Sequence, residues 1–537
     1  MVRPELEVGP LTTDCKWCRR PNYLRDPSPK ARRERVSRRA EAMTKDHWAA
    51  MSNQERLARL LLVRSSEGPD GLPSEATIAA IQAGVGAFHG PPLRARPRVD
   101  GAGDSRRFNA VMHERAQNAT GLDVLVGANA ETGLAYTTGA GGFDIPYPAA
   151  LGQLNPVRSR SAGRAVGRDL DACGYNWCFQ PVADVRTTSE DPVIGVRAFG
   201  TDPGIVGPHM REYGLGLQEA GVIATVKHFP GHGDANVDSH LGLPVVRRTD
   251  DEWELHLSTF AEAARADLGA AMTAHLQFED EGDATVSTFD PRICTELLRN
   301  DLGFTGLLVS DSLRMAAVSD RHSPAEAAML AISAGCDIAN VKCSPEIVPS
   351  ILEGMERGLL DGTLPEERVY EAFGRVLSAP LSVPTESHQV SADIVPLFNE
   401  ELHVATLGEP NLPTGKDPIT MVMAEPSGEA PDADALGTLL TNHIGRTVHV
   451  QYEVGALSGA TVMVSYGQAG PTAWEADAIA SVEGSGKPAV VLMAGPPDTL
   501  DRYTASLPAI AVPALDVFGM PSLTGFTAAF RTLLTTS

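Results

Sequence analysis

The sequence predicts an α/β protein: a TIM-type (β/α)8-like barrel followed by a smaller α/β (αβα) sandwich domain. Short apolar runs with the length of buried strands alternate with helical stretches from about residue 52 onward. Such alternation is typical of βα units, which close into a barrel or wind into an open sheet. After about residue 380 a Pro-containing stretch precedes a second series of short apolar runs. We therefore expect two folded domains in this chain of 537 residues.

The predicted boundaries divide the chain into four parts. They are a basic N-terminal arm (1–46), the barrel (47–382), a linker (383–412) and the C-terminal α/β domain (413–537). The arm is rich in arginine, and we interpret it as a solvated segment packed on the acidic body rather than as a nucleic-acid site. Cys15 and Cys18 have the spacing of half a zinc site, but no second Cys or His pair follows at the usual distance. A structural zinc is therefore the less favoured interpretation.

The folded body is expected to begin with a helix. Residues 52–55 have the capping-box pattern, and Leu57, Leu60, Leu61 and Val63 follow with helical spacing. Seven strands are then expected at Gly84–His89, Leu122–Asn129, Trp177–Asp184, Gly221–His228, Ala270–His275, Gly306–Asp311 and Cys336–Val341. Helices are expected between or after them at 159–172, 205–219, 251–267, 324–334 and 345–358. Seven strands favour a closed barrel over an open sheet.

The C-terminal domain is expected to be a doubly wound α/β sheet. Its predicted strands are Ile419–Ala424, Val448–Tyr452, Thr461–Ser465, Ala489–Met493 and Ala509–Val512. Gly, Pro and helical segments separate these runs, which is the pattern that such a sheet requires.

Bulk composition excludes several classes of protein. A net charge of -23 argues against a nucleic-acid partner, which needs a basic surface. No basic start precedes an apolar run, and no stretch of about 18 apolar residues is long enough to span a membrane, so we expect a cytoplasmic protein with no membrane partner. The seven cysteines are scattered, which agrees with a reducing compartment. We interpret Cys173, Cys178, Cys294, Cys336 and Cys343 as core or helix-face residues.

The densest group of ionisable residues follows the strand expected at Gly221–His228. Lys227 and His228 end this strand, and the turn-forming residues 229–231 break it. The loop continues through His232, Asp234, Asp238 and His240. In parallel α/β folds the carboxyl ends of the strands and the loops after them carry ligands and catalytic groups. This segment is therefore the candidate active-site loop.

Two carboxylates have positions that suit catalysis. Asp238 precedes His240 by two residues, so the pair is either an orienting carboxylate with a general acid/base imidazole or a structural dyad. Asp311 ends an apolar strand, where an acid projects into the mouth of a barrel. It could equally be the N-cap of a helix near residues 312–317.

Several blocks together resemble glycoside hydrolase family 3, and within it the β-N-acetylglucosaminidase branch with an Asp-His catalytic dyad. The blocks are Lys227–Gly233 with Asp238-Ser239-His240, Met272–His275, and Leu302–Met315. Further blocks, Tyr175–Val185 and Ile194–Gly200, occur in the same order as in the family. The resemblance covers residues from about 50 to 380, whereas the second domain carries no motif of comparable specificity.

The resemblance implies a retaining exo-β-N-acetylhexosaminidase that acts on a small soluble β-glycoside or a cell-wall fragment. Asp311 would be the nucleophile, His240 the general acid/base, and Asp238 would orient His240. Neither a cofactor nor a metal is implied.

The same resemblance implies a set of substrate-binding residues: Lys227, His228, Arg197, Asn129, Glu131 and Met272. Asn129 stands where family members commonly place an aspartate that holds the distal hydroxyls of the sugar, and Glu131 could substitute for it. The exact sugar is therefore open.

Alternatives remain at this point. The glycosyl-enzyme could be transferred to phosphate, or the sugar could be glucose, which would make the protein a β-glycoside phosphorylase or a β-glucosidase. His228, His232, Asp234, Asp238 and His240 could instead hold a metal in a hydrolase. A non-catalytic carbohydrate-binding protein is the third alternative, and the sequence predicts no oligomeric state.

Overall fold

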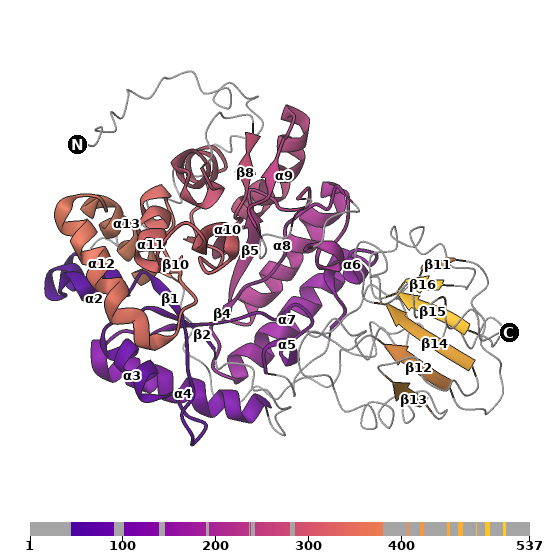
Figure 1. Ribbon diagram of the computed structural model, residues 1–537, viewed down its shortest axis with the longest axis horizontal. Coiled ribbons are helices and arrows are strands. Elements are labelled where there is room, and N and C mark those ends of the chain that lie inside the picture. Colours follow the sequence, from indigo (N-terminus) through magenta and orange to yellow (C-terminus); the bar gives the residue numbers. More distant parts are fainter. Residues whose placement is uncertain are drawn as a thin grey trace.

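The structure is a computed structural model that describes residues 44–90, 101–138, 145–188, 193–235, 237, 242–279 and 285–379, with residue 480 and six short strands between 405 and 511. Eight parallel strands form a sheet in the order β10-β1-β2-β3-β4-β5-β7-β9. Figure 1 shows helices around this sheet. The bounds of the strands are β1 Leu61–Arg64, β2 Ala87–His89, β3 Leu125–Ala128, β4 Trp177–Cys178, β5 Ile223–Phe229, β7 Ala270–Thr273, β9 Leu307–Val309 and β10 Ala339–Asn340. Val309 and Ile338 form a parallel bridge between the two outer strands. The sheet therefore closes into a barrel, as predicted.

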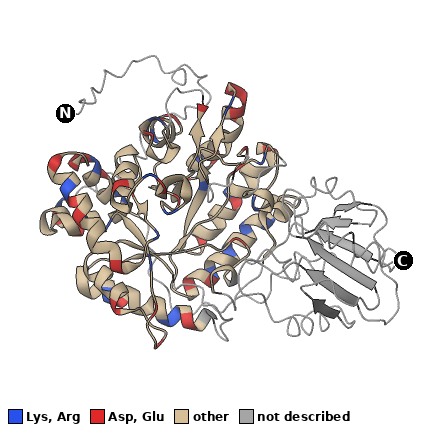
Figure 2. Ribbon diagram, viewed as in Figure 1, with Lys and Arg blue, Asp and Glu red and all other residues tan. Residues whose placement is uncertain are grey.

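Helices form the outer ring of the barrel. The longer ones are α3 Glu75–Gln82, α4 Gly101–Thr120, α7 Pro156–Ala172, α8 Pro203–Glu219, α9 Asp250–Arg265, the π-helix η6 Arg292–Asp301, α11 Pro324–Ala334, α12 Val348–Asp361 and α13 Glu366–Leu377. Side chains of Ser74, Asn155, Asp202, Thr249 and Ser323 cap helices in this ring. Charged residues of both signs are spread over the outer helices (Figure 2). All five helices predicted in this region are present within a few residues of the expected bounds.

One predicted helix is wrong in its second half. The capping box of Ser52 and Glu55 is present, but the helix α2 ends at Ala58 after Asn53–Ala58. Leu61–Arg64 is instead β1, paired in parallel with β10 and β2. Leu60 to Val63 are fully buried, and a strand that is covered on both faces reads as a continuous apolar run. A short run of this kind cannot be distinguished from a helical face by periodicity alone.

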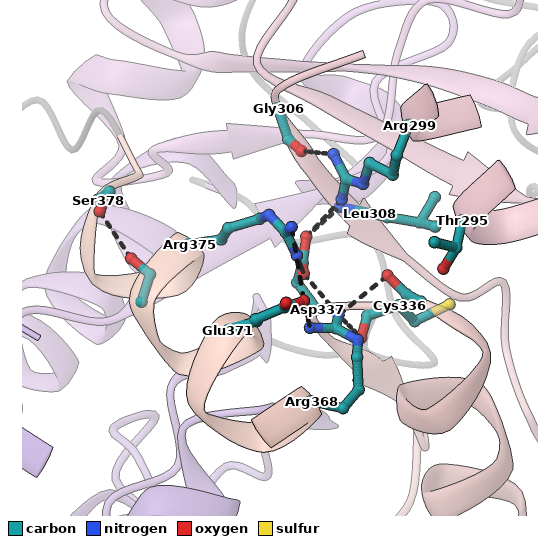
Figure 3. Close-up of polar contacts among 12 residues, drawn as sticks. Thr295, Arg299, Gly306, Leu308, Cys336, Asp337, Arg368, Glu371, Arg375 and Ser378 are labelled. Carbon is teal, nitrogen blue, oxygen red and sulfur yellow. Dashed lines mark hydrogen bonds and ion pairs between the residues drawn. The ribbon is translucent and has the colours of Figure 1, made fainter. Parts of the chain in front are cut away.

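A buried carboxylate fastens the end of the barrel sequence to its neighbours (Figure 3). Asp337, which lies just before β10, accepts bonds from Arg299 at 2.6 Å, Arg368 at 2.8 Å and Arg375 at 2.9 Å. It also accepts from the backbone N–H of Leu308 in β9 at 2.9 Å. The network joins η6, α13 and the two strands that close the barrel, so we assign it a structural role.

A second, six-stranded sheet lies in the C-terminal part of the chain. Its order is β11-β16-β15-β14-β12-β13, and every pair is parallel except β11 with β16. The strands are β11 Ala405–Leu407, β12 Ile419–Met423, β13 Val448–Gln451, β14 Ala460–Ser465, β15 Ala489–Met493 and β16 Ala509–Ala511. Without β11, the strand order corresponds to 2-1-3-4-5, an order typical of doubly wound sheets. All five predicted strands are present, and β11 lies in the segment that was predicted to be a linker.

The N-terminal arm falls almost wholly outside the described residues, and Cys15 and Cys18 with it. Residues 44–50 are helical, and Trp48 packs edge-on against Tyr370 and Phe373. The five other cysteines are buried free thiols, as expected. Across the described segments, no helix is long and apolar enough to cross a membrane.

Candidate active site

The carboxyl ends of β3, β5, β7 and β9 bring most of the predicted site residues together. Asn129 and Glu131 follow β3, Lys227 and His228 lie in the last part of β5, and Asp311 follows β9. Parallel strands of a barrel end at one face, so these side chains share the mouth. Asp238 and His240 lie outside the described residues.

Glu131 is the centre of a buried charged cluster. Arg197, from the 3-10 turn Gly195–Arg197, bonds to both its carboxylate oxygens at 2.7 and 2.8 Å. Lys227 donates to Glu131 Oε1 at 3.0 Å and to Asn129 Oδ1 at 3.4 Å. Burial would raise the pKa of Glu131, but the charges of Arg197 and Lys227 outweigh it and hold that pKa well below its usual range. Four of the predicted substrate-binding residues thus form one unit.

His228 is held by Asp184, a residue that the sequence analysis did not assign to the site. Nδ1 of His228 lies 2.7 Å from Asp184 Oδ2, and the backbone N–H groups of His228 and His232 also bond to this carboxylate. Burial would raise the pKa of Asp184, but the charge and hydrogen bonds of His228 lower it to about 2. Its place at the end of a predicted strand could have identified Asp184 as a site residue, as the same position did for Asp311.

Asp311 is an ionised carboxylate at the end of β9. Its Oδ1 accepts from the backbone N–H of Ser312 at 2.6 Å, and its own N–H donates to Thr273 Oγ1 at 3.3 Å. Burial would raise the pKa of Asp311, but the charges of His228 and His275 and the Ser312 bond keep it well below its usual range. The next helix, α10 Ala316–Ser319, has its N-cap at residue 315, so the capping interpretation of Asp311 is wrong.

His275 is a second residue that the sequence analysis left without a role. Its Nδ1 lies 2.8 Å from Thr288 Oγ1 and its Nε2 lies 3.0 Å from the carbonyl oxygen of Ser312. These bonds connect the end of β7 to the turn that follows Asp311. Met272, also in β7, is buried and pairs in register with Lys227.

The loop after β5 is anchored by Arg248, which lies just before α9. Arg248 donates to both carboxylate oxygens of Asp234 at 2.6 and 2.7 Å, and to the carbonyl oxygens of Pro230 and Gly231 at 3.1 and 2.7 Å. Its guanidinium lies over the rings of Trp253 and Phe278. The ends of the segment that carries Asp238 and His240 are therefore tied together.

The donor set of the metal alternative is partly engaged elsewhere. Asp234 is paired with Arg248, and His228 with Asp184. In the part of the chain that the structure describes, no three His, Cys, Asp or Glu side chains are grouped so that they could hold a metal ion.

Comparison with known proteins agrees with this architecture. The family model "Glycosyl hydrolase family 3 N terminal domain" matches residues 97–379, more than half of the chain. Beta-hexosaminidase LpqI of Mycobacterium bovis is 31% identical over 336 residues, which cover 61% of this chain and 82% of that protein. Beta-hexosaminidase A of Pseudoalteromonas piscicida is 30% identical over 273 residues, or 47% of this chain.

The matches cover different shares of the relatives' own lengths. The chain spans only 44% of the Pseudoalteromonas protein and 56% of a beta-N-acetylglucosaminidase/beta-glucosidase of Cellulomonas fimi. Among solved structures, a glycoside hydrolase family 3 beta-N-acetylglucosaminidase from Paenibacillus sp. str. FPU-7 has a TM-score of 0.78 at 25% identity, covering 90% of this chain and 97% of that one. The chain belongs to glycosyl hydrolase family 3.

Proposed function

We propose that the protein is a retaining exo-β-N-acetylhexosaminidase that removes a terminal β-linked N-acetylglucosamine. The observation that carries this proposal is Asp311: an ionised carboxylate at a strand end, beside a buried cluster of hydrogen-bond donors. The names of the similar proteins, hexosaminidases and an N-acetylglucosaminidase, support the choice of sugar. A small soluble glycoside or a cell-wall fragment is the proposed substrate.

The proposed reaction has two displacements. Asp311 attacks the anomeric carbon while His240, oriented by Asp238, gives its proton to the leaving oxygen. The neutral imidazole then removes a proton from water, which attacks the anomeric carbon and releases the Asp311 carboxylate. Because its pKa is held well below the usual range, the Asp311 carboxylate is ionised at neutral pH, as a nucleophile must be.

The proposed sugar-binding groups retain hydrogen-bonding atoms for a ligand after their internal bonds are counted. Lys227 has three N–H donors, and its bonds to Glu131 and Asn129 use two of them. His228 directs Nδ1 to Asp184, which leaves Nε2 for a ligand. Glu131 has both oxygens engaged by Arg197 and Lys227, so its role is to hold these two cations. We infer that Lys227 and His228 contact the sugar and that Glu131 sets their geometry.

The test is initial rate on 4-nitrophenyl β-N-acetylglucosaminide beside the β-glucoside, for wild type, Asp311→Asn and Asp320→Asn. Asp320 follows α10 and is exposed, which makes it a matched control. We expect the wild type and Asp320→Asn to prefer the acetamido sugar, and only Asp311→Asn to lose turnover. In the wild type, the peptide that contains Asp311 should carry the glycosyl adduct. Preference for the glucoside would overturn the sugar assignment, and full activity of Asp311→Asn would overturn the mechanism.

The cytoplasmic location and the division into arm, barrel, linker and sandwich domain stay predictions from the sequence. Fractionation of cells that produce the protein tests the first. Limited proteolysis followed by mass spectrometry tests the second, since cuts are expected in the part of the predicted linker that precedes β11, between residues 383 and 404.

A further inference from the structure

Three basic residues that have no part in the proposed mechanism lie at the ends of β9, β10 and β1, on the same face of the barrel as Asp311. Arg64 is the last residue of β1, Lys342 follows β10, and Arg314 lies three residues after Asp311. The backbone N–H groups of Arg64 and Lys342 bond across the seam between β1 and β10 at 3.0 and 3.2 Å, and Leu313 bonds to the end of β10 at 2.9 Å. The three bases therefore come from three neighbouring strand ends at the mouth of the barrel.

These three side chains have no ion-pair partner among the described residues. The carboxylate of Glu346, in the turn that follows Lys342, accepts a hydrogen bond from Ser344 instead. The local excess of positive charge contrasts with the net charge of -23 of the whole chain. The pKa of His89, which lies nearby, is lowered to about 3, first by burial and then by the charges of Lys342 and Arg64.

Lys342 is the most unusual of the three. It is only half-exposed, and its φ of 40° lies in the left-handed region, which residues other than glycine seldom adopt. Burial lowers its pKa, and although Asp311 opposes this effect, the charges of Arg64, Lys227 and Arg314 add to it. Lys342 is thus a half-buried cation on a strained backbone, and neighbouring cations repel it. This arrangement lowers the stability of the fold, and such strained positions gather at ligand sites.

We propose that Arg64, Arg314 and Lys342 form a binding site for an oxyanion beside the scissile bond. The proposal rests on the proposed function, because it locates the oxyanion relative to a glycoside whose anomeric carbon is at Asp311. The sugar-binding groups come from the β3 and β5 ends, whereas these bases come from the β9, β10 and β1 ends. An anion held there would be part of the leaving group or of the acceptor that attacks the anomeric carbon. The three bases would offset the repulsion between this anion and the Asp311 carboxylate.

Two sources supply this chemistry. The first is a carboxylate on the leaving group, bound in the intact substrate. The second is free phosphate as acceptor: an oxygen of the phosphate dianion forms a bond to the anomeric carbon, the bond to Asp311 breaks, and sugar 1-phosphate leaves. No proton has to be removed from the dianion in that step.

The first arm of the test compares two N-acetylglucosaminides that differ in one charge, those of 4-hydroxybenzoate and of its methyl ester, at low ionic strength. We expect kcat/KM of the wild type to favour the carboxylate by about tenfold, since one charge-assisted hydrogen bond contributes that much. Lys342→Asn, which tolerates the left-handed backbone, and Arg314→Gln should lower the preference towards one and leave the ester within about twofold. Arg115→Gln, an exposed base on α4, should keep the preference.

The second arm adds inorganic phosphate to the ester reaction and identifies the product by phosphorus NMR. A higher rate with sugar 1-phosphate, lost in Lys342→Asn, would assign the site to free phosphate. An enzyme that hydrolyses the ester but shows neither a carboxylate preference nor a phosphate effect would overturn the anion site alone. If neither glycoside is cleaved, the proposed function fails instead. The anion site is then tested by the increase in Tm that phosphate causes relative to chloride at equal ionic strength. Equal increases in wild type and Lys342→Asn would overturn it.

Discussion

His228 and Asp184 form a buried pair in which one carboxylate binds both the side chain and the backbone of the histidine. Nδ1 lies 2.7 Å from Oδ2, and the backbone N–H of His228 lies 3.1 Å from Oδ1. Because Asp184 is fully buried and ionised, it fixes which nitrogen of His228 carries the proton. In the proposed function, this leaves Nε2 for the sugar.

We expect Asp184→Asn to lower kcat/KM by about 10- to 100-fold, because an amide can neither fix the tautomer nor accept all these bonds. A double-mutant cycle with His228→Gln is the measurement. If the two residues act as a unit, the double variant will be little worse than the worse single variant. Strictly additive losses would contradict the pairing.

Glu131→Gln is expected to damage binding more than chemistry. The substitution leaves Arg197 and Lys227 buried without a counter-charge, and breaking such a pair typically costs about 3–5 kcal/mol. We expect a lower Tm and a raised KM, with kcat reduced less. Glu212→Gln is the control, since Glu212 pairs with the more exposed Arg160 on the outer helices. A KM unchanged in Glu131→Gln would show that the cluster does not shape the sugar site.

Acid should unfold the barrel through its depressed carboxylates. Burial opposes ionisation of Asp337, but Arg375, Arg299 and Arg368 lower its pKa to about 2, below its value in the unfolded chain. A depressed pKa stabilises the fold above the unfolded value of about 3.9, and this stability is lost as the pH falls from about 4 to 2. Urea unfolding of Asp337→Asn between pH 7 and pH 3 should show lower stability at pH 7 and a flatter acid limb. An identical pH slope in both proteins would contradict this.

Much of the barrel could be predicted because its strands are β-branched runs that end at turn residues. Such a run gave Gly221–His228, and β5 occupies Ile223–Phe229. β1 was missed because a true capping box precedes it, so the leucines after Ala58 continued an apparent helix. In the second sheet β11 was missed because three residues between polar segments carry too little pattern.

The places of Lys227, His228 and Asp311 at strand ends could be predicted, because position along a strand decides them. The pairing of side chains from distant segments could not be predicted. Glu131 meets Arg197 across 66 residues, and Asp184 meets His228 across 44. Spacing in the sequence does not predict such pairs, because the way the strands close into a barrel decides which side chains meet.

Arg248 should act on catalysis through the loop whose ends it ties together. If His240 is the general acid, His240→Ala will lose about 100-fold or more on poor leaving groups and little on 2,4-dinitrophenyl glycosides, which need no protonation. Arg248→Lys keeps the charge but loses the two-pronged bond to Asp234, so the segment that carries His240 loses its anchor.

We therefore expect Arg248→Lys to reproduce the leaving-group dependence of His240→Ala in weaker form, about tenfold on 4-methylphenyl glycosides. The measurement is kcat/KM across a series of aryl leaving groups for both variants, with melting curves to confirm folding. Arg265→Lys, at the other end of α9, serves as the control. Equal losses on good and poor leaving groups would mean that Arg248 only stabilises the fold, because an effect on packing cannot distinguish one leaving group from another.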